Sequence, residues 1–262
     1  MGHLVLENLS ELNRSPSPDA ANSDRLHPDP MVSSPLVIIP AYNEARFVGE
    51  TVRRVLAAGN YPVLVIDDGS ADETREVALA AGALVASHPF NLGYGSALQT
   101  GYKYALDHDY EVLVQLDADG QHDPVWIGDL IAPVLSGRAD LSIGSRFKKP
   151  SGYEMGAARS AGRRFFRLLL QWFGGPAIED PTSGLQALSR RTFAFYSEDF
   201  FPFDFPDIDV LLLAHKRGFR IEEVPVEMGA SPEGRTPMHT GLTTLYYPYK
   251  MLLSTFRNWR LG

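Results

Sequence analysis

The chain has 262 residues, of which 44% are hydrophobic and 21% are charged, and its formal net charge is −8. This length and composition are typical of one or two folded domains and exclude a disordered polymer or a coiled coil. The acidic balance argues against nucleic acid as a partner, because the phosphate backbone would repel most of the surface. The absence of cysteine excludes disulfides, thiolate metal sites and a cysteine nucleophile.

We expect neither a membrane-spanning helix nor a signal peptide. The sequence has no uninterrupted run of about 18 apolar residues, and its start lacks the basic-then-apolar order of a signal peptide. With no cysteine, we expect a cytoplasmic protein. Residues 1–33 are rich in Pro, Ser, Asp and Asn and predict a disordered tail, with a docking peptide as the alternative.

From residue 35, short apolar runs alternate with amphipathic stretches. Strands are expected at 36–39, 63–66, 83–87, 112–116 and 141–144, and helices at 44–58, 71–81, 95–106 and 124–135. This alternation predicts an α/β fold with a mainly parallel sheet covered on both faces. Ser70 and Glu73 have the spacing of a capping box and predict the start of the second helix.

Beyond residue 145 the alternation stops. A basic loop and helix at 146–173 are followed by a turn at 180–184, a helix at 207–216, a strand at 221–226 and a flexible loop at 229–237. Because no linker separates the two halves, we expect one domain over residues 34–238. Residues 239–262 predict a C-terminal amphipathic helical segment, which would cover a membrane interface, the domain's own core or a second subunit.

Polar residues follow every expected strand of the first half. In an open parallel sheet, ligands bind outside the carboxyl ends of the strands. Asp67, Asp68, Asp117 and Asp119 would converge at that edge. Asp117 and Asp119 could share one hard divalent cation, or else one caps a helix and the other is solvated. His122 is either a third ligand or a surface residue.

Two common nucleotide-binding motifs are absent from the position where they would be expected. The first strand is followed by neither G-x-G-x-x-G nor G-x-x-x-x-G-K-[ST]. Hydride transfer and ATP hydrolysis by those routes are therefore disfavoured. What remains is a fold that holds a diphosphate through a metal.

Six motifs in order carry a family resemblance: PAYNE, DDGS, NLGYGSA, DADGQH, GSR and DPTSG. Over about residues 35–255 the chain resembles the family-2 glycosyltransferases, and within them the dolichyl- and polyprenyl-phosphate sugar synthases (dolichol-phosphate mannosyltransferase-like). The resemblance implies a GT-A fold, which is a Rossmann-like three-layer sandwich. It also implies a nucleotide-diphosphate sugar donor, Mg²⁺ or Mn²⁺, and inversion at the anomeric carbon.

The resemblance also implies roles for individual residues. The nucleotide sugar would be bound by Pro40, Ala41, Tyr42, Glu44, Asp67, Asp68, Asp117 and Gln121. The metal would be held by Asp117, Asp119 and Gln121, and the catalytic residues would be Asp119, Arg146, Asp180 and Arg235. The acceptor phosphate would be bound by Arg146, Arg159, Ser160 and Arg163. The last two depart from the family pattern, in which a Ser follows the helix Arg by four positions.

Residues 146–167 form a basic segment inside an acidic protein. They hold seven Lys or Arg residues against one Glu, a net charge of +6. A lipid-phosphate acceptor is already ionised and needs cations, whereas a hydroxyl acceptor needs a general base. The segment therefore favours a phosphate acceptor or an anionic membrane, with an ordinary solvated helix as the alternative.

Three of the aspartates that follow the basic segment in the sequence have candidate roles. Asp180 could be the base for a hydroxyl acceptor, could orient an arginine or could cap a turn. Asp207 and Asp209 are expected to be cap and surface residues.

The sequence thus predicts an inverting glycosyltransferase that moves a sugar from a GDP- or UDP-sugar to a polyprenyl or dolichyl phosphate. Transfer to a hydroxyl of a glycan or small molecule is the alternative, followed by a non-catalytic scaffold with the same fold. We expect peripheral binding at the cytoplasmic face of a membrane, directly or through a separate membrane protein.

Overall fold

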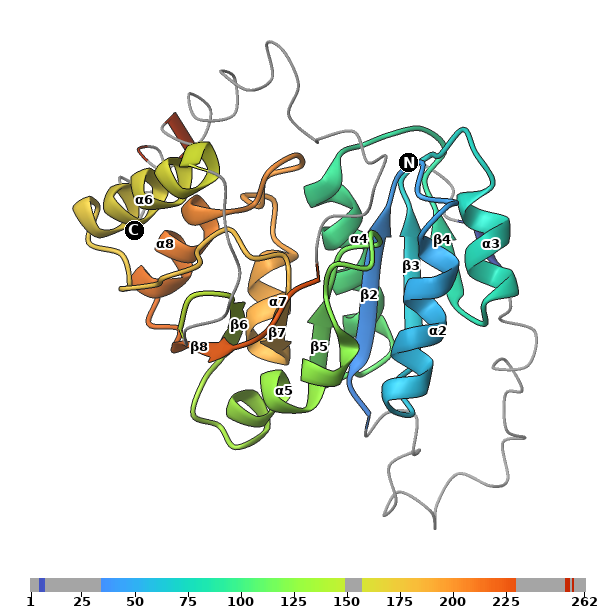
Figure 1. The fold of residues 1–262 in the computed structure, drawn as a ribbon, viewed down its shortest axis with the longest axis horizontal. Coiled ribbons are helices and arrows are strands. Elements are labelled where there is room, and N and C mark those ends of the chain that lie inside the picture. The colour runs from blue at the N-terminus through green and yellow to red at the C-terminus, as the bar shows by residue number, and fades with distance from the viewer. Residues whose placement is uncertain (1–4, 8–33, 149–156, 230–252, 255, 257–262) are drawn as a thin grey trace.

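The computed structural model describes residues 5–7, 34–148, 157–229, 253–254 and 256, with side chains at 34–148, 164–229 and the last three positions. Figure 1 shows the chain. The strands are β1 (Val5–Glu7), β2 (Leu36–Ala41), β3 (Val63–Asp67), β4 (Leu84–Ser87), β5 (Val112–Gln115), β6 (Leu141–Ser145), β7 (Gln186–Ser189) and β8 (Ile221–Pro225). The helices are α2 (Val48–Ala58), α3 (Thr74–Ala80), α4 (Tyr94–Asp107), α5 (Ile127–Leu135), α6 (Ala157–Trp172), α7 (Arg190–Tyr196) and α8 (Ile208–Lys216), with a short 3₁₀ helix at Pro124–Trp126.

All eight strands of the described residues form one sheet in the order β1-β4-β3-β2-β5-β7-β6-β8. Strands β2, β3, β4, β5, β6 and β8 run in one direction, and β1 and β7 run against them. The mainly parallel α/β sheet predicted from the sequence is confirmed. The carboxyl ends of β2, β3, β5 and β6 therefore meet at one edge.

Two hydrophobic cores lie on opposite faces of the sheet, as alternating strand residues require. Ile38 of β2 belongs to the core beneath α4, α6, α7 and α8, while its neighbour Ile39 belongs to the core beneath α2, α3 and α5. Figure 1 shows α2 and α5 on one face and α4 and α7 on the other. This is the three-layer sandwich expected from the resemblance.

The expected strands are confirmed to within two residues, and two helix starts are corrected. The first helix begins at Val48 instead of residue 44, and the second begins at Thr74 instead of residue 71. The capping box was a wrong prediction, because Glu73 is the N-cap residue and its side chain makes no capping hydrogen bond, while the Asp72 carboxylate accepts the N–H of Thr74 at 3.1 Å. The Ser70 hydroxyl instead accepts a hydrogen bond from the backbone N–H of Asn43.

Strands β1 and β7 were not predicted. Within the expected tail, β1 pairs antiparallel with β4, with Val5 opposite Ser87. The other residues of 1–33 lie outside the described part of the chain. So does the predicted C-terminal helix, except for residues 253, 254 and 256. No helix in the described residues is both long enough and apolar enough to cross a bilayer.

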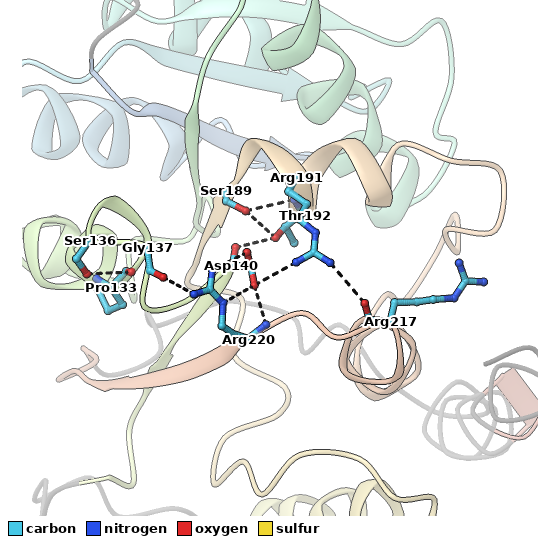
Figure 2. Close-up of polar contacts among 9 residues, drawn as sticks. All are labelled: Pro133, Ser136, Gly137, Asp140, Ser189, Arg191, Thr192, Arg217 and Arg220. Atoms are coloured by element: carbon cyan, nitrogen blue, oxygen red, sulfur yellow. Dashed lines mark hydrogen bonds and ion pairs between the residues drawn. The ribbon is translucent and has the colours of Figure 1, made fainter.

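Figure 2 shows a polar cluster at the amino end of β6, opposite the carboxyl ends of the parallel strands. The carboxylate of Asp140 accepts hydrogen bonds from the backbone N–H and the guanidinium of Arg220, and lies 3.5 Å from the guanidinium of Arg191. Its carbonyl accepts the Thr192 hydroxyl at 2.7 Å. Burial alone would raise the pKa of Asp140, but hydrogen bonds and charge from Arg220, with charge from Arg191, lower it. The cluster ties α7 and the α8–β8 connection to the sheet.

Candidate active site

A cleft of about 780 Å³ opens at the carboxyl ends of the parallel strands. Its walls come from the segments that follow β2, β3, β4 and β5, and from residues 204 and 205. It is lined by Pro40, Ala41, Tyr42, Asn43, Glu44, Arg46, Phe47, Asp68, Asn91, Gly93, Tyr94, Ala97, Asp117, Ala118, Asp204 and Phe205. The edge of the sheet that the sequence predicted for a ligand site therefore carries a cleft.

The loops after β2 and β3 are locked to each other. Asn43 adopts a left-handed backbone conformation, with φ of 56°, which Asn tolerates better than most residues. Its side-chain oxygen accepts the N–H of Ala71 at 2.8 Å, and its own N–H donates to Ser70 at 2.9 Å. The N–H of Glu44 donates to the Thr74 hydroxyl at 2.8 Å. These bonds fix the wall that presents Tyr42 and Glu44.

Asp67 holds its own turn and does not line the cleft. Its carboxylate accepts the Ser70 N–H at 3.1 Å and the Ser87 hydroxyl at 3.2 Å, and the residue is buried. The sequence prediction placed this side chain beside the nucleotide. In the structure, both of its carboxylate oxygens accept hydrogen bonds from the protein.

Asp68 lines the cleft but also holds a neighbouring loop. Its carboxylate accepts the N–H groups of Leu92 and Gly93 at 2.9 Å each, and lies 2.6 Å from Nδ1 of the buried His88. The other ring nitrogen of His88 is 2.9 Å from the Thr100 hydroxyl. Sequence reasoning missed His88, since nothing in its local pattern separates it from an ordinary residue after a strand.

Asp117 is the carboxylate of the Asp-x-Asp pair that faces the cleft. One oxygen accepts the Tyr94 hydroxyl at 3.0 Å, and the other lies 3.2 Å from Nε2 of His122. A side-chain carbon on Gly184 would lie only 2.7 Å from that second oxygen. Burial, together with the charge of Asp117, raises the pKa of Tyr94 well above its ordinary value, so the phenol stays protonated and donates.

Asp119 is buried and is not among the residues that line the cleft. Its two oxygens accept the backbone N–H and the side-chain amide of Gln121, at 3.0 and 2.9 Å. The loop between the two aspartates is fixed from α2, because the Thr51 hydroxyl donates to the Ala118 carbonyl at 2.8 Å. The predicted metal ligands thus lie in one short loop, with Asp117 toward the cleft.

These residues fit a cation of the Mg²⁺ type, which takes one or two protein carboxylates and completes its shell with water and substrate phosphates. No group of three or more His, Asp or Glu side chains able to hold a metal occurs in the described residues. Nε2 of His122 lies 3.2 Å from an oxygen of Asp117, which leaves Nδ1 as the second ring nitrogen. That buried nitrogen has no hydrogen-bond partner in the described part of the chain.

Arg146 and Asp180 form a paired unit at the end of β6. Nε and Nη2 of Arg146 each donate to Asp180 at 2.6 Å, and the Arg146 backbone N–H donates at 3.2 Å. Asp180 is fully buried, and its N–H donates to Glu223 at 2.8 Å. Residues 180–184 reach this edge because β7 runs antiparallel to β5 and β6, so that its start lies beside their ends. Of the three roles open to Asp180, the contacts match the orienting of an arginine.

Other predicted site residues are only partly described. Arg159, Ser160 and Arg163 belong to α6, but their side chains lie outside the described part of the chain. Arg235 lies outside it altogether.

The prediction of a surface position for Asp209 was wrong. Asp209 is fully buried in the first turn of α8, where it accepts the Val210 N–H at 2.9 Å and the Ser254 hydroxyl. Burial raises its pKa. Asp207 occupies the N-cap position of α8, as expected, but its side chain makes no capping hydrogen bond.

One wall of the cleft comes from a loop that sequence reasoning did not single out. Asp204 and Phe205 line the cleft, and the carbonyls of Phe203 and Asp204 accept the N–H groups of Ser96 and Gly95 at the start of α4. These bonds satisfy backbone donors that a helix start leaves unpaired. The loop is far away in sequence, so no local pattern could have placed it there.

Comparison with known proteins agrees with this architecture. Residues 36–193 match the family model described as glycosyl transferase family 2. The chain is 35% identical over 217 residues to the polyprenol monophosphomannose synthase of Mycolicibacterium smegmatis, covering 75% of this chain and 79% of that one. It is 28% identical over 210 residues to the UDP-N-acetylglucosamine--dolichyl-phosphate N-acetylglucosaminyltransferase of Methanococcus voltae, covering 73% and 84%.

Among solved structures, glucosyl-3-phosphoglycerate synthase from Mycobacterium tuberculosis with phosphoglyceric acid superposes with a TM-score of 0.67 at 22% identity, covering 86% of this chain and 79% of that one. Its complex with Mn²⁺, UDP and glucosyl-3-phosphoglycerate gives 0.63 at 20% identity, with the same coverage. At this identity the likeness concerns the fold alone, which is that of the GT-A glycosyltransferases. The family match over residues 36–193 and the 35% identity to the Mycolicibacterium smegmatis synthase show that this chain belongs to glycosyl transferase family 2.

Proposed function

We propose that this protein transfers a sugar from a nucleotide-diphosphate sugar to a polyprenyl phosphate, with inversion and with Mg²⁺ or Mn²⁺ as cofactor. The observation that carries the proposal is the cleft at the strand ends, with Asp117 on its wall. Two relatives whose names specify a polyprenol or dolichyl-phosphate reaction support the acceptor class. The Mn²⁺ and UDP bound by the structural neighbour support the donor and cofactor class.

The donor would occupy the cleft between the β2 and α4 walls. Its volume of about 780 Å³ lies within the range of small-molecule sites. Pro40, Ala41, Tyr42 and Glu44 would surround the nucleotide, with Asp68 opposite. Asp67 would act through the turn that it holds.

A phosphate acceptor accounts for the absence of an evident general base at the Arg146–Asp180 pair. A phosphate monoester is ionised at neutral pH, so its oxygen attacks without losing a proton. Asp180 is fully buried and bound to Arg146, which suits it to orienting the guanidinium and not to proton transfer. Arg146, Arg159, Ser160 and Arg163 would hold the acceptor phosphate.

In the proposed reaction, an acceptor phosphate oxygen attacks the anomeric carbon from the face opposite the diphosphate. The bond to the diphosphate breaks, and the configuration inverts. Asp117, Asp119 and Gln121 would hold the cation, which supplies positive charge for the departing diphosphate when bound. Arg146 and Arg235 would add fixed positive charge near the phosphates.

Helix α6 offers a surface suited to a membrane. Phe165, Leu168 and Trp172 are exposed, and their spacing places them on one side of the helix. Arg164 is exposed beside them, and the sequence of the helix is rich in arginine. Apolar and basic side chains on one amphipathic helix favour the interface of an anionic bilayer. We propose that the enzyme works at the cytoplasmic face of a membrane, on its own or with a separate membrane protein.

A donor screen tests the proposal. UDP- and GDP-sugars are added with Mn²⁺ and the melting temperature is measured, because a bound ligand stabilises the fold by RT ln(1 + [L]/Kd). We expect one donor class to raise the melting temperature, and the Asp119→Ala variant to fold but to lose metal-dependent transfer. Full turnover by Asp119→Ala would remove the metal assignment. The absence of any metal-dependent donor binding would favour a non-catalytic scaffold.

A further inference from the structure

We propose that Tyr94 is a positioning residue whose hydroxyl holds the Asp117 carboxylate in its orientation at the cleft. The inference rests on the proposed function, because it assigns one residue's part in the metal-dependent donor site. Tyr94 lies within the NLGYGSA motif, but the resemblance assigned no role to its side chain.

Tyr94 and His122 contact the two oxygens of the Asp117 carboxylate. The Tyr94 hydroxyl donates to one oxygen of Asp117 at 3.0 Å, while His122 approaches the other oxygen at 3.2 Å. Hydrogen bonds to an ionised acceptor are about twice as strong as neutral ones. Contacts on both oxygens leave the carboxylate little freedom to rotate.

The backbone on either side of Tyr94 is held in place by hydrogen bonds. The N–H of the preceding residue, Gly93, donates to Asp68 at 2.9 Å. The next residue, Gly95, donates its N–H to the Asp204 carbonyl at 3.3 Å. The phenol therefore projects from a helix start that is anchored on both sides, and does not simply follow Asp117.

Gly184 packs closely against the Asp117 carboxylate. A Cβ atom at position 184 would lie within 2.7 Å and 3.0 Å of its two oxygens. Only glycine leaves room for the carboxylate where Tyr94 and His122 hold it. Tyr94 and Gly184, from two segments distant in sequence, and His122, from the same loop as Asp117, thus converge on one orientation of one side chain.

A second tyrosine on α4 provides a matched control. Tyr102 lies two helical turns further on and donates its hydroxyl to the Gln115 side chain at 2.5 Å. Gln115 belongs to β5 and precedes Asp117 by two residues. Tyr102 and Tyr94 therefore reach the same part of the chain, but the Tyr102 bond lies in the core and away from the cleft.

The test compares Tyr94→Phe with Tyr102→Phe, using the affinity for Mn²⁺ in the presence of UDP or GDP, measured by calorimetry or electron paramagnetic resonance. Removing a partner that orients a metal ligand typically weakens metal binding about 10–100-fold. We expect such a loss in Tyr94→Phe, with UDP or GDP binding in EDTA unchanged. Transfer should recover at saturating Mn²⁺, with a raised KM for the metal and a kcat close to wild type. Tyr102→Phe should lower the melting temperature but leave the Mn²⁺ affinity unchanged.

Several outcomes overturn the inference. A wild-type Mn²⁺ affinity in Tyr94→Phe refutes the inference and leaves the proposed function intact. An equal loss of Mn²⁺ affinity in Tyr94→Phe and Tyr102→Phe has the same meaning. A wild-type protein that binds no Mn²⁺ with either nucleotide overturns both proposals. If Tyr94→Phe does not fold, Gly184→Ala crowds Asp117 from the other side, and an unchanged Mn²⁺ affinity in that variant also refutes the inference.

Discussion

The ion pair between Arg146 and Asp180 has two donor–acceptor distances of 2.6 Å and a carboxylate that is fully buried. Its two parallel N–H···O contacts fix the plane of the guanidinium. An arginine fixed in this way can meet phosphate without first losing side-chain entropy. The pair therefore serves both stability and, in the proposed reaction, phosphate binding.

Substituting Asp180 should be costly. Breaking a buried ion pair by removing one partner typically destabilises a protein by about 3–5 kcal/mol. We expect Asp180→Ala to lose stability of that order in urea unfolding. Glu222→Gln is the control, since Arg138 and Glu222 form an exposed pair and such pairs contribute about 0–1 kcal/mol. Equally small losses in the free energy of unfolding of both variants would show that the buried pair stabilises the protein no more than the exposed pair does.

At the same scale, the sequence identified the residue types at the strand ends but not what each side chain contacts. Asp67 and Asp68 were expected beside the nucleotide; Asp68 lines the cleft, and both carboxylates also accept hydrogen bonds from backbone N–H groups. Asp209 was expected on the surface, yet it is buried because Ser254 and backbone N–H groups surround it. The distant partners Ser87, Leu92 and Ser254 lie 20 to 45 residues from the aspartates that they contact and leave no local pattern.

At the scale of elements, the start of α4 and the loop at 202–205 form one unit. The α4 backbone donates to the carbonyls of Phe203 and Asp204, and Phe205 reaches the cleft. The approach is so close that a Cβ atom on Gly95 would lie 2.0 Å from the Pro202 carbonyl oxygen. The cleft wall therefore depends on a backbone-to-backbone contact.

Gly95→Ala should consequently disrupt this wall. A methyl group cannot fit against a carbonyl oxygen, so the loop must move, and overpacking of this kind typically costs about 1–3 kcal/mol. We expect a lower melting temperature and weaker donor binding. Gly128→Ala is the matched control, because Gly128 lies in α5 with no atom within 4 Å of the new methyl. Replacing a helix glycine there should stabilise the protein by about 0.5–1 kcal/mol. Unchanged donor binding in Gly95→Ala would contradict this account.

Helix α6 should determine binding to lipid surfaces. Trp172 is 88% exposed, on the same side as Phe165 and Leu168. We expect Trp172→Ser to reduce sedimentation with anionic vesicles and to leave donor binding unchanged. Leu135→Ser is the control, since Leu135 is a similarly exposed apolar residue at the end of α5. Equal vesicle binding by wild type and Trp172→Ser would exclude this face as the membrane contact.

Elements of the first half were predictable because hydrophobic runs and amphipathic stretches alternate there. Strand β7 was not, because four residues between a turn and a helix carry too short a pattern. Its antiparallel insertion between β5 and β6 depends on pairings 71–77 positions apart with β5, such as Gln115 with Gln186, and 43–47 positions apart with β6. That strand also explains why residues 180–184 reach the site, which the sequence motif alone does not.

At the scale of the whole molecule, two buried carboxylates respond to pH in opposite directions. Burial would raise the pKa of Asp140, but Arg220 and Arg191 lower it overall. Asp140 therefore stabilises the fold above its unfolded pKa, and this contribution is lost as the pH falls through the lowered folded value. Burial raises the pKa of Asp209, which therefore costs stability at neutral pH, and the cost disappears as the pH falls.

The corresponding asparagine variants should differ in sign. In urea unfolding at pH 7, Asp140→Asn should be less stable than wild type, and the gap should shrink as the pH falls through the acid range. Asp209→Asn should be more stable than wild type at pH 7, and this gap should also close in acid. A pH-independent difference in either variant would contradict the assigned pKa direction.

The central claim concerns the whole site: a cation-dependent donor cleft that serves a phosphate acceptor. The most direct measurement follows radiolabelled sugar from the UDP- or GDP-sugar identified by the screen into the lipid phase. Polyprenyl phosphate and unphosphorylated polyprenol are compared as acceptors, with Mn²⁺ or EDTA. We predict transfer to polyprenyl phosphate only, lost in EDTA and in Asp117→Asn. Transfer to polyprenol at an equal rate, or undiminished transfer by Asp117→Asn, would contradict the account.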